Sequence, residues 1–328
     1  MSLRSRIAGA LPGDISDQVS HTIVYDNPTL NTLAAAIINL LSGDDGQPNM
    51  ATKQKAVENM IRKYSVFDPI HKPKETLSSH GILLTGSTGA LGSHVLEILL
   101  GRSDITKVFV VNRPSATPSS ERQAQSFASK GLDPSLLNDD RIVWLEGDPA
   151  GLAELWVDEV DVIIHNAWML DFNHGLSSFE SHIRTTHALI NVVRNAAHKI
   201  RFLFTSSTSA VQSWDSSHGA VPERVHAPAE ALGKGYGESK YVVEALLAKA
   251  EFEYTVLRIG QIAGGAPLGA WATTDWVPTM VKSSIAIGAL PSAVGVSVFD
   301  SLVCSYANRT PVIDTLLDTH AYCFAGCC

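Results

Sequence analysis

The chain has 328 residues, of which 45% are hydrophobic and 18% are charged, and its formal net charge is −8. This composition is typical of a globular protein rather than a disordered one, and the length allows two domains. The acidic balance argues against a general nucleic-acid binder, because phosphate contacts need a basic surface.

Signals for export, membrane insertion or metal binding are weak. The basic start, residues 1–6, precedes an apolar patch over only 7–11, which is too short for a signal peptide, and no apolar run has the length of a membrane span. All four cysteines lie in the last 25 residues, whereas a secreted disulfide framework would spread them through the fold. The histidines form no pair with metal-ligand spacing. We therefore expect a cytoplasmic protein without a metal.

The N-terminal region is expected to be a small helical piece followed by a linker. Residues 27–30 (Asn-Pro-Thr-Leu) predict a helix start, with apolar residues at helical spacing up to Leu41 and a Gly-Asp-Asp-Gly end at 43–46. Residues 46–78 are polar and contain three prolines, with one predicted helix over 57–64.

The stretch 82–100 predicts a strand, a tight turn and a helix. An apolar run at 82–84 leads into three glycines at three-residue spacing, and apolar residues then recur at helical period. A glycine turn that opens a helix presents backbone N–H groups and the positive end of the helix dipole to an anion. The stretch therefore predicts a dinucleotide pyrophosphate site. Its residues are Gly86, Thr88, Gly89, Ala90, Leu91 and Gly92.

Strands and helices then alternate along the chain, with helices expected over 179–193 and 236–249. The further predicted strands are 107–112, 141–147, 161–166, 201–205 and 254–258. This alternation predicts an α/β fold of the Rossmann type, a doubly wound parallel sheet.

Arg113 ends the second predicted strand, 21 residues beyond Gly92 (113 − 92). An acidic residue at this place suits the ribose 2′-hydroxyl of NAD, whereas an arginine suits the 2′-phosphate of NADP, so we predict NADPH as the cofactor. Two interpretations stay open for Arg122, a second positive contact or a surface arginine. Two also stay open for Asp148 after the third strand, a contact to the adenine or a simple turn.

The pair Tyr236-x-x-x-Lys240 opens a predicted helix, and positions four apart share one helix face. An ammonium at ~4 Å contributes roughly 4 kcal/mol at an effective dielectric constant of ~20. We therefore expect Lys240 to lower the pKa of the Tyr236 phenol from its usual ~10 and to fit it for proton donation. Ser207, in the serine run that ends the fifth strand, is expected to hold a carbonyl oxygen beside the phenol. Ser207, Tyr236 and Lys240 are the predicted catalytic residues.

These motifs together resemble the extended short-chain dehydrogenases/reductases. More narrowly, residues 84–89, 165–173, 257–264 and 269–284 resemble the terminal thioester reductase domains of fungal adenylate-forming reductases. Those enzymes are multidomain relatives of nonribosomal peptide synthetases, carboxylic acid reductases and aminoadipate reductase. The resemblance covers about residues 80–291.

The resemblance implies reduction of a phosphopantetheine-bound acyl thioester by NADPH, with release of an aldehyde or alcohol in fungal secondary metabolism. Ser207 would hold the developing oxyanion, Tyr236 would protonate it, and Lys240 would bind the nicotinamide ribose. Trp168 and Asp171 would face the substrate, although core packing explains Trp168 equally well. The segment Arg258–Ile262 would line the nicotinamide side. The further implied cofactor contacts are Asn166, Ala167, Ile259, Gln261 and Ile262.

Residues 3–7 and 24–30 resemble the second half of a carrier domain, which precedes the reductase in that family. The serine motif that accepts phosphopantetheine is absent from this piece, so upstream adenylation and carrier domains are the implied partners, without nucleic acid or membrane. The expected divisions are a partial carrier-like segment 1–45, a linker 46–78, the NADP-binding domain 79–268, and an incomplete or divergent substrate lobe 269–328.

Residues 292–328 show no steady period, and we expect this tail to pack poorly. Its Cys323-x3-Cys327-Cys328 ending is only a weak candidate for a metal site or a prenylated tail. Two rival functions stay open. A nucleotide-sugar epimerase or dehydratase on the same fold is disfavoured by the carrier-like start and by residues 168–173, whereas a non-catalytic NADP-binding or docking fragment is favoured by the incomplete lobe.

Overall fold

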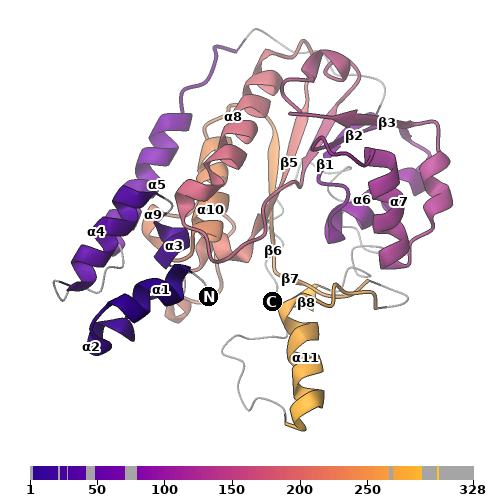
Figure 1. Ribbon diagram of the computed structural model, residues 1–328. Helices are drawn as coiled ribbons and strands as arrows, with labels where there is room; N and C mark the ends of the chain where they lie inside the picture. The colour runs from indigo at the N-terminus through magenta and orange to yellow at the C-terminus, as the bar shows by residue number, and fades with distance from the viewer. Residues whose placement is uncertain are drawn as a thin grey trace.

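The computed structural model describes residues 3–20, 23–27, 29–41, 49–70, 80–265, 269–289 and 301–302. Its main body is built on a six-stranded parallel sheet in the order β3-β2-β1-β4-β5-β6 (Figure 1). The strands are β1 (His80–Thr85), β2 (Ile105–Asn112), β3 (Ile142–Glu146), β4 (Val162–His165), β5 (Arg201–Ser207) and β6 (Tyr254–Ile259). All six predicted strands and the predicted Rossmann-type doubly wound sheet are confirmed.

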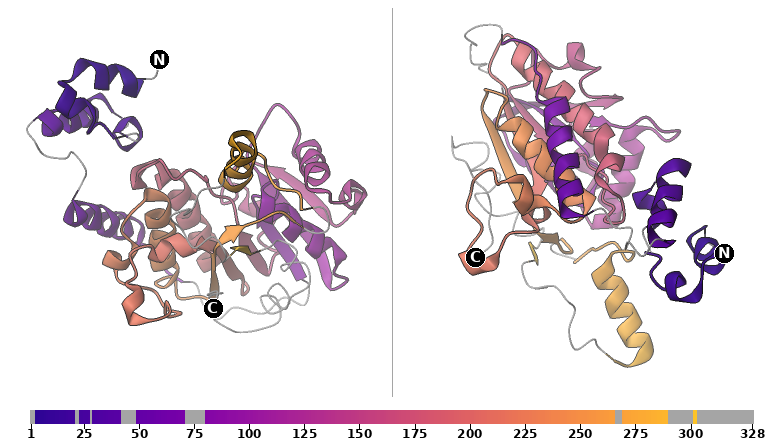
Figure 2. Two further views of the ribbon diagram at one scale, coloured as in Figure 1. Left: turned by 90° about the horizontal axis from the view of Figure 1, so that it is seen from below. Right: turned by 90° about the vertical axis from the view of Figure 1, so that its left-hand side faces the viewer.

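Helices cover both faces of this sheet. Helices α6 (Ala90–Gly101) and α7 (Ser119–Lys130) lie on one side, and α8 (Glu180–Asn195) and α10 (Gly235–Leu247) lie on the other (Figures 1 and 2). Neighbouring strand residues point to opposite faces. Leu83 therefore packs with the α8 and α10 side chains, whereas Ile82 packs with the α6 side chains. Five of the strands are largely buried on both faces, which explains their continuous apolar runs, whereas the edge strand β3 is only half-buried.

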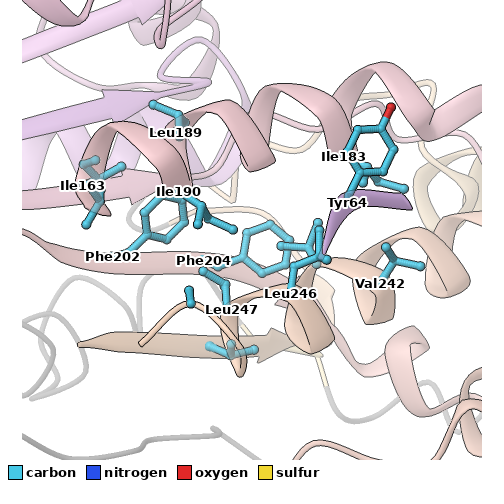
Figure 3. Close-up of a cluster of buried hydrophobic side chains, with 14 of the residues drawn as sticks. Tyr64, Ile163, Ile183, Leu189, Ile190, Phe202, Phe204, Val242, Leu246 and Leu247 are labelled. Carbon is cyan, nitrogen blue, oxygen red and sulfur yellow. The ribbon is translucent and has the colours of Figure 1, made fainter. Parts of the chain in front are cut away.

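The core between the sheet and helices α8 and α10 is rich in aromatic side chains. Figure 3 shows Phe202 and Phe204 of β5 lying between Ile190 of α8 and the pair Leu246 and Leu247 of α10. All five side chains are fully buried. Burial of a side chain of this size contributes about 1.5–3 kcal/mol, so this cluster fixes α10 firmly on β5.

Helix α7 is absent from the sequence prediction. Its sequence, SSERQAQSFASK, has no apolar stripe, and Phe127 is its one large apolar side chain that reaches the core. Its other buried side chains are polar, namely Ser119, Gln123 and Ser126. Polar residues that are buried by tertiary contacts give no periodic hydrophobic signal, which is why the pattern failed here.

The N-terminal residues form four helices with a small core of their own. They are α1 (Leu3–Ala10), α2 (Gly13–Ser16), α3 (Ile23–Asp26) and α4 (Leu30–Leu41). Ala8, Val19, Ile23, Ala36 and Leu40 are the buried members of this core. The predicted helix that ends at Leu41 is thus confirmed.

The middle of the predicted linker is a helix packed on the main body. Helix α5 (Met50–Tyr64) begins at Asn49, whose side chain accepts a hydrogen bond from the Thr52 N–H, and packs against α10 and α8. Its Val57 is 0% exposed. Lys53 Nζ donates to the Gly233 carbonyl at 2.8 Å, and Tyr64 Oη donates to Glu180 at 2.9 Å. These contacts make α5 an outer layer of the main body rather than a free connection.

The remaining elements are α9 (Pro228–Ala231), α11 (Trp276–Ile287) and the short parallel strands β7 (Gln261–Ile262) and β8 (Ser301–Leu302). Most of the predicted tail, including all four cysteines, lies outside the described residues, as do residues 42–48 and 71–79 of the predicted linker. Within the described ranges, every helix is too short or too polar to cross a bilayer. The same ranges contain no group of three His, Cys, Asp or Glu side chains that could hold a metal ion.

Candidate active site

The glycine turn lies at the carboxyl end of β1 and opens helix α6. Gly86 has a φ of +71°, which suits a residue without a side chain, and its carbonyl accepts from the Gly89 N–H at 3.2 Å. A Cβ atom added at Gly92 would lie 2.1 Å from the Gly86 carbonyl oxygen, so helix and turn are in direct backbone contact. Gly89 and Ala90 are exposed at the positive end of α6. This cradle fits a pyrophosphate, as the sequence predicts.

The end of β4 is fastened to this turn. The Thr85 hydroxyl oxygen accepts from the backbone N–H groups of Asn166 and Ala167, each at 3.1 Å. The Asn166 side-chain amide also donates to the Gly86 carbonyl at 3.1 Å. Two predicted cofactor residues therefore lie directly beside the predicted phosphate turn.

The same hydroxyl fixes a buried histidine, which the sequence analysis did not single out. With two N–H groups already bound, the Thr85 hydroxyl donates its own proton to His165 Nδ1 at 3.0 Å, and His165 Nε2 then donates to Thr186 at 3.0 Å. Burial, together with smaller contributions from Lys240 and His182, lowers the pKa of His165 to about 3. His165 is therefore neutral, with its proton on Nε2.

This histidine should make the protein sensitive to acid. Its pKa is about 3 in the folded chain and about 6.5 when unfolded, so the unfolded state binds more protons below pH 6.5 and stability falls as the pH falls. Between pH 6.5 and pH 5 the loss should be about 2 kcal/mol. We expect urea titrations at several pH values to show this slope in the parent chain and a shallower slope in His165→Gln. The exposed His218→Gln variant should keep the parent slope, and an unchanged slope in His165→Gln would contradict the assignment.

The three predicted catalytic residues come together on the other side of the same edge. Ser207 ends β5, and Tyr236 and Lys240 lie on α10, which packs against that strand. The Ser207 side chain lies close enough to the Tyr236 phenol to act on its pKa. Phe172 packs edge-on against the phenol, with ring centroids 4.9 Å apart, and is 45% exposed. A serine hydroxyl and a phenol thus meet beside an apolar surface at the mouth of the site.

The expected effect of Lys240 on the Tyr236 phenol is wrong in this structure. Burial raises the pKa of Tyr236 to about 12, although the hydrogen bond with Ser207 acts in the opposite direction. Lys240 Nζ donates to the Thr205 carbonyl at 2.6 Å and lies 4.3 Å from the ring centroid of Trp168. Burial also lowers the pKa of Lys240 well below its ordinary value, against the opposing effect of Glu244. Desolvation therefore outweighs the attraction that spacing alone suggested.

Trp168 and Asp171 have local partners. Trp168 covers Lys240 and donates from Nε1 to Ser239 Oγ at 3.2 Å, which agrees with the packing interpretation. Asp171 accepts from the Asn173 N–H at 2.9 Å and pairs with His174 at 3.3 Å, so it shapes its own loop.

The segment that is expected to select the cofactor follows β2. Arg113 is exposed. The pKa of His182 is lowered most by burial, next by Lys240 and least by the Arg113 guanidinium, so the charge of Arg113 acts near the predicted catalytic residues. Arg122 donates to the Arg113 carbonyl at 2.7 Å and to Glu146 at 3.1 Å, so it secures this segment from α7. Asp148 is exposed, and its carbonyl accepts from the Leu152 N–H at 3.1 Å, as in a turn.

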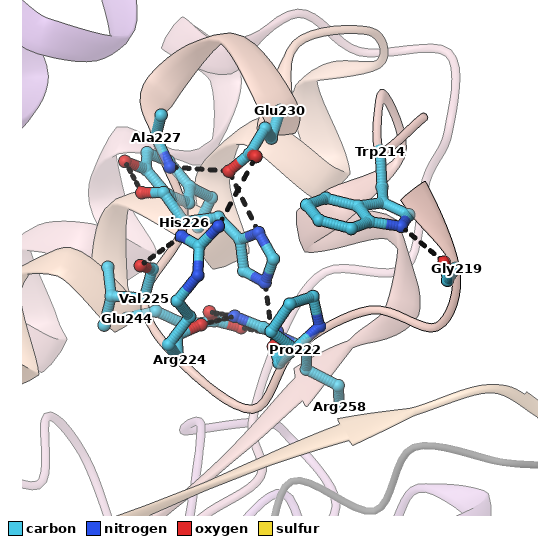
Figure 4. Close-up of polar contacts among 11 residues, drawn as sticks. Trp214, Gly219, Pro222, Arg224, Val225, His226, Ala227, Glu230, Glu244 and Arg258 are labelled. Atoms are coloured by element: carbon cyan, nitrogen blue, oxygen red, sulfur yellow. Dashed lines mark hydrogen bonds and ion pairs between the residues drawn. The ribbon is translucent and has the colours of Figure 1, made fainter. Parts of the chain in front are cut away.

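Residues 258–262 were expected to line the nicotinamide side, and only some of them lie where that expectation requires. Ile259 is paired in register with Ser207 and therefore lies at the site edge. Gln261 and Ile262 form β7, where Gln261 Oε1 accepts from Trp276 Nε1 at 3.0 Å. Arg258 does not line the site. Its side chain is 4% exposed and pairs with Glu244 at 2.5 Å (Figure 4), because β6 directs alternate side chains away from the cleft.

The parallel sheet has the strand order of a Rossmann-type dinucleotide-binding domain. The glycine turn and the Ser-Tyr-Lys group at its carboxyl edge define a domain of the reductase class. The chain belongs to the NAD-binding family described as male sterility protein, whose model matches residues 84–307.

Relatives in fungi and in solved structures agree with this assignment. The chain is 41% identical to adenylate-forming reductase Nps11 of Serpula lacrymans var. lacrymans (strain S7.9) over 90% of its own length, but spans only 30% of that protein. In structure it is similar to the terminal R domain from the myxalamid PKS-NRPS biosynthetic pathway, with a TM-score of 0.70 and 24% identity over 81% of this chain and 71% of the other. It is also similar to an archaeal thiolation-reductase di-domain, with a TM-score of 0.61 and 18% identity over 87% of this chain and 62% of the other. The predicted relationship to terminal reductase domains of adenylate-forming enzymes is thereby confirmed.

Proposed function

We propose that this chain is the reductase part of a larger fungal adenylate-forming enzyme, and that it reduces a carrier-bound acyl thioester with NADPH to release an aldehyde or alcohol. The observation that carries the proposal is the closeness of the Ser207 side chain to the Tyr236 phenol, at the same sheet edge as the glycine cradle. The 41% identity to an adenylate-forming reductase supports the substrate class, and the relative's greater length supports further domains in the intact enzyme.

The chain's own residues divide the work of the reaction. NADPH supplies the hydride when bound, and the residues proposed to hold it are the glycine turn, Arg113, Asn166 and Ala167. The Ser207 hydroxyl would donate a hydrogen bond to the carbonyl oxygen of the thioester as negative charge develops there. Tyr236, which keeps its proton because its pKa is about 12, would then give that proton to the oxygen. Collapse of the resulting hemithioacetal would free the thiol and leave the aldehyde.

Lys240 is proposed to serve the nicotinamide ribose. Its amino group carries donors that suit ribose hydroxyls, and it lies 5.8 Å from the Tyr236 ring centroid. The further proposed contacts are Ile259, beside Ser207 in the sheet, and Gln261 and Ile262 after β6. Arg122 and Asp148 are proposed to act at the adenosine end, Arg122 by holding the Arg113 segment.

We also propose that residues 1–45 are part of a carrier domain, that a connection over 46–78 leads to the NADP-binding domain 79–268, and that 269–328 begins a substrate lobe. The four small helices with their own core support the first division. The docked helix α5 gives the connection a rigid middle.

Turnover of a synthetic pantetheine thioester by the full chain, followed as loss of NADPH absorbance, tests the function. Aldehyde or alcohol formation supports it. NADPH binding without turnover would favour the non-catalytic alternative, and turnover of a nucleotide sugar instead would favour the epimerase or dehydratase alternative.

Arg113 should determine the preference for NADPH over NADH. A charge-assisted phosphate contact is worth about 1.5–3 kcal/mol, so Arg113→Ala should weaken NADPH binding about tenfold to a hundredfold and leave NADH binding nearly unchanged. Fluorescence titration with both cofactors measures this. Arg62→Ala, an exposed arginine of α5, is the control. Equal dissociation constants for the two cofactors in the parent chain would refute the proposed role.

A further inference from the structure

A buried polar network connects helix α7 to the back of the glycine turn. Gln123 is 0% exposed, and Ser126 and Ser93 are also buried. The Ser93 and Ser126 hydroxyl oxygens lie 2.9 Å apart, and Lys130 Nζ donates to Ser126 Oγ at 2.6 Å. Buried polar groups are costly unless they are satisfied, so a cluster of this size behind a binding loop calls for an explanation.

The network binds carbonyl groups of the turn itself. Gln123 Nε2 donates to the Ser87 carbonyl at 3.1 Å, and Ser126 Oγ donates to the Thr88 carbonyl at 2.8 Å. Ser93 Oγ lies 3.0 Å from the Ser87 carbonyl oxygen and 2.9 Å from that of Gly89. The Ser87 and Thr88 carbonyls are therefore held by α7, whereas the Gly89 carbonyl is held by Ser93 of α6, whose N–H also donates to it at 3.0 Å.

The orientation of these carbonyls fixes the orientation of the amides. In a trans peptide the N–H group points opposite to the C=O group of the same unit. The Ser87 carbonyl shares its unit with the Thr88 N–H, and the Gly89 carbonyl shares its unit with the Ala90 N–H. Because the Ser87 carbonyl is held by α7, the Thr88 N–H faces away from α7. Because the Gly89 carbonyl is held inside the first turn of α6, the Ala90 N–H points out of the start of that helix. The Gly89 N–H between them is occupied by the Gly86 carbonyl.

We propose that Gln123 and Ser126 of α7, together with Ser93, are positioning residues of the cofactor site. They hold the turn so that the N–H groups of Thr88 and Ala90 are aimed at the pyrophosphate before the cofactor arrives. The inference rests on the proposed seat of the pyrophosphate on this turn, but not on thioester reduction. Preorganised donors of this kind increase affinity by reducing the ordering cost of binding.

The test compares two ligands in matched variants. NADP⁺ carries the pyrophosphate, whereas adenosine 2′-monophosphate lacks it and depends on the Arg113 end of the site. In Ser126→Ala and Gln123→Met, each of which removes one donor to the turn, the dissociation constant of NADP⁺ should rise about tenfold. The constant for adenosine 2′-monophosphate should stay within about twofold of the parent value. Steady-state kinetics should show a raised KM for NADPH with little change in kcat.

Ser129→Ala is the control, because the Ser129 hydroxyl donates to the Ser126 carbonyl within α7 and not to the turn. It should leave both constants unchanged. Ser126→Thr, which keeps the hydroxyl, should restore most of the NADP⁺ affinity. If Gln123→Met does not fold, the smaller change Ser126→Ala carries the test. An equal loss for both ligands, or unchanged NADP⁺ binding in folded Ser126→Ala, would overturn the positioning role. Failure of the parent chain to bind NADP⁺ would overturn it together with the proposed cofactor site, whereas failure of thioester turnover alone would not.

Discussion

Replacing Tyr236 by phenylalanine is expected to lower thioester turnover by about 10²–10⁴-fold while the dissociation constant for NADPH stays within about twofold. The change removes only the phenolic oxygen. The ring remains packed against Phe172 and Phe179, so the shape of the site is kept. The loss therefore reports proton donation and not folding. Single-turnover reduction of a pantetheine thioester, with a parallel NADPH titration, separates the two effects.

The pH dependence of the parent chain should agree with this assignment. The pKa of Tyr236 is raised to about 12 by burial, so the phenol keeps its proton across the neutral range and turnover should show no loss from Tyr236 ionisation below about pH 10. Tyr241→Phe is the matched control. Tyr241 lies on the same helix, and its hydroxyl donates to the His226 carbonyl at 2.9 Å, away from the site. Parental turnover in Tyr236→Phe would eliminate Tyr236 as the acid.

Replacing Arg258 by methionine is expected to destabilise the fold by about 3–5 kcal/mol, because it leaves the buried Glu244 carboxylate without its cation. Arg258 Nη2 lies 2.5 Å from Glu244 Oε2 (Figure 4). Glu244 is fully buried, and the Ser206 hydroxyl also donates to it at 2.5 Å. The pair joins β6 to α10, the helix that carries Tyr236 and Lys240. Urea unfolding monitored by circular dichroism measures the loss.

Two further variants make this result specific. Glu244→Gln combined with Arg258→Met should recover part of the lost stability, since no buried charge then remains unpaired. Arg224→Ala removes the half-exposed partner of Glu230, 3.7 Å away, and should shift the free energy of unfolding by less than about 1 kcal/mol. A loss of similar size in Arg224→Ala and Arg258→Met would show that burial of the pair is unimportant.

The parts of the fold that could be predicted from sequence are those with a local signal. Six apolar runs marked the six strands. Five of these strands are largely buried, and strands buried on both faces carry continuous hydrophobic residues, whereas β3 is a half-buried edge strand. The glycine turn was recognisable because Gly86 and Gly92 meet backbone constraints that no side chain tolerates. The proximity of Ser207 to Tyr236 followed from strand order, since the carboxyl ends of parallel strands share one edge.

What the sequence did not reveal depends on burial and on contacts between distant segments. Helix α7 lacks an apolar stripe, because Gln123 and Ser126 are buried by hydrogen bonds to the turn and not by hydrophobic packing. The spacing of Tyr236 and Lys240 predicted that the two side chains share one helix face. It did not predict where the Lys240 side chain points, which is to the Thr205 carbonyl. His165 was overlooked as a functional residue, since its neutral state depends on Thr85 and Thr186 in other elements.

The docking of α5 also limits how far the N-terminal helices can travel. Helix α4 ends at Leu41 and α5 begins after Asn49, and α5 is held at one end by Lys53 and at the other by Tyr64. Eight peptide steps of at most about 3.6 Å each give a tether shorter than ~30 Å between them. A group carried by α1–α4 is thereby confined near the reductase, and a tether of this maximal reach corresponds to an effective concentration roughly in the millimolar range. Under the proposed carrier assignment, even a thioester that binds weakly in free solution would occupy the site. Once the product is released from its carrier, it would lose this raised local concentration at once.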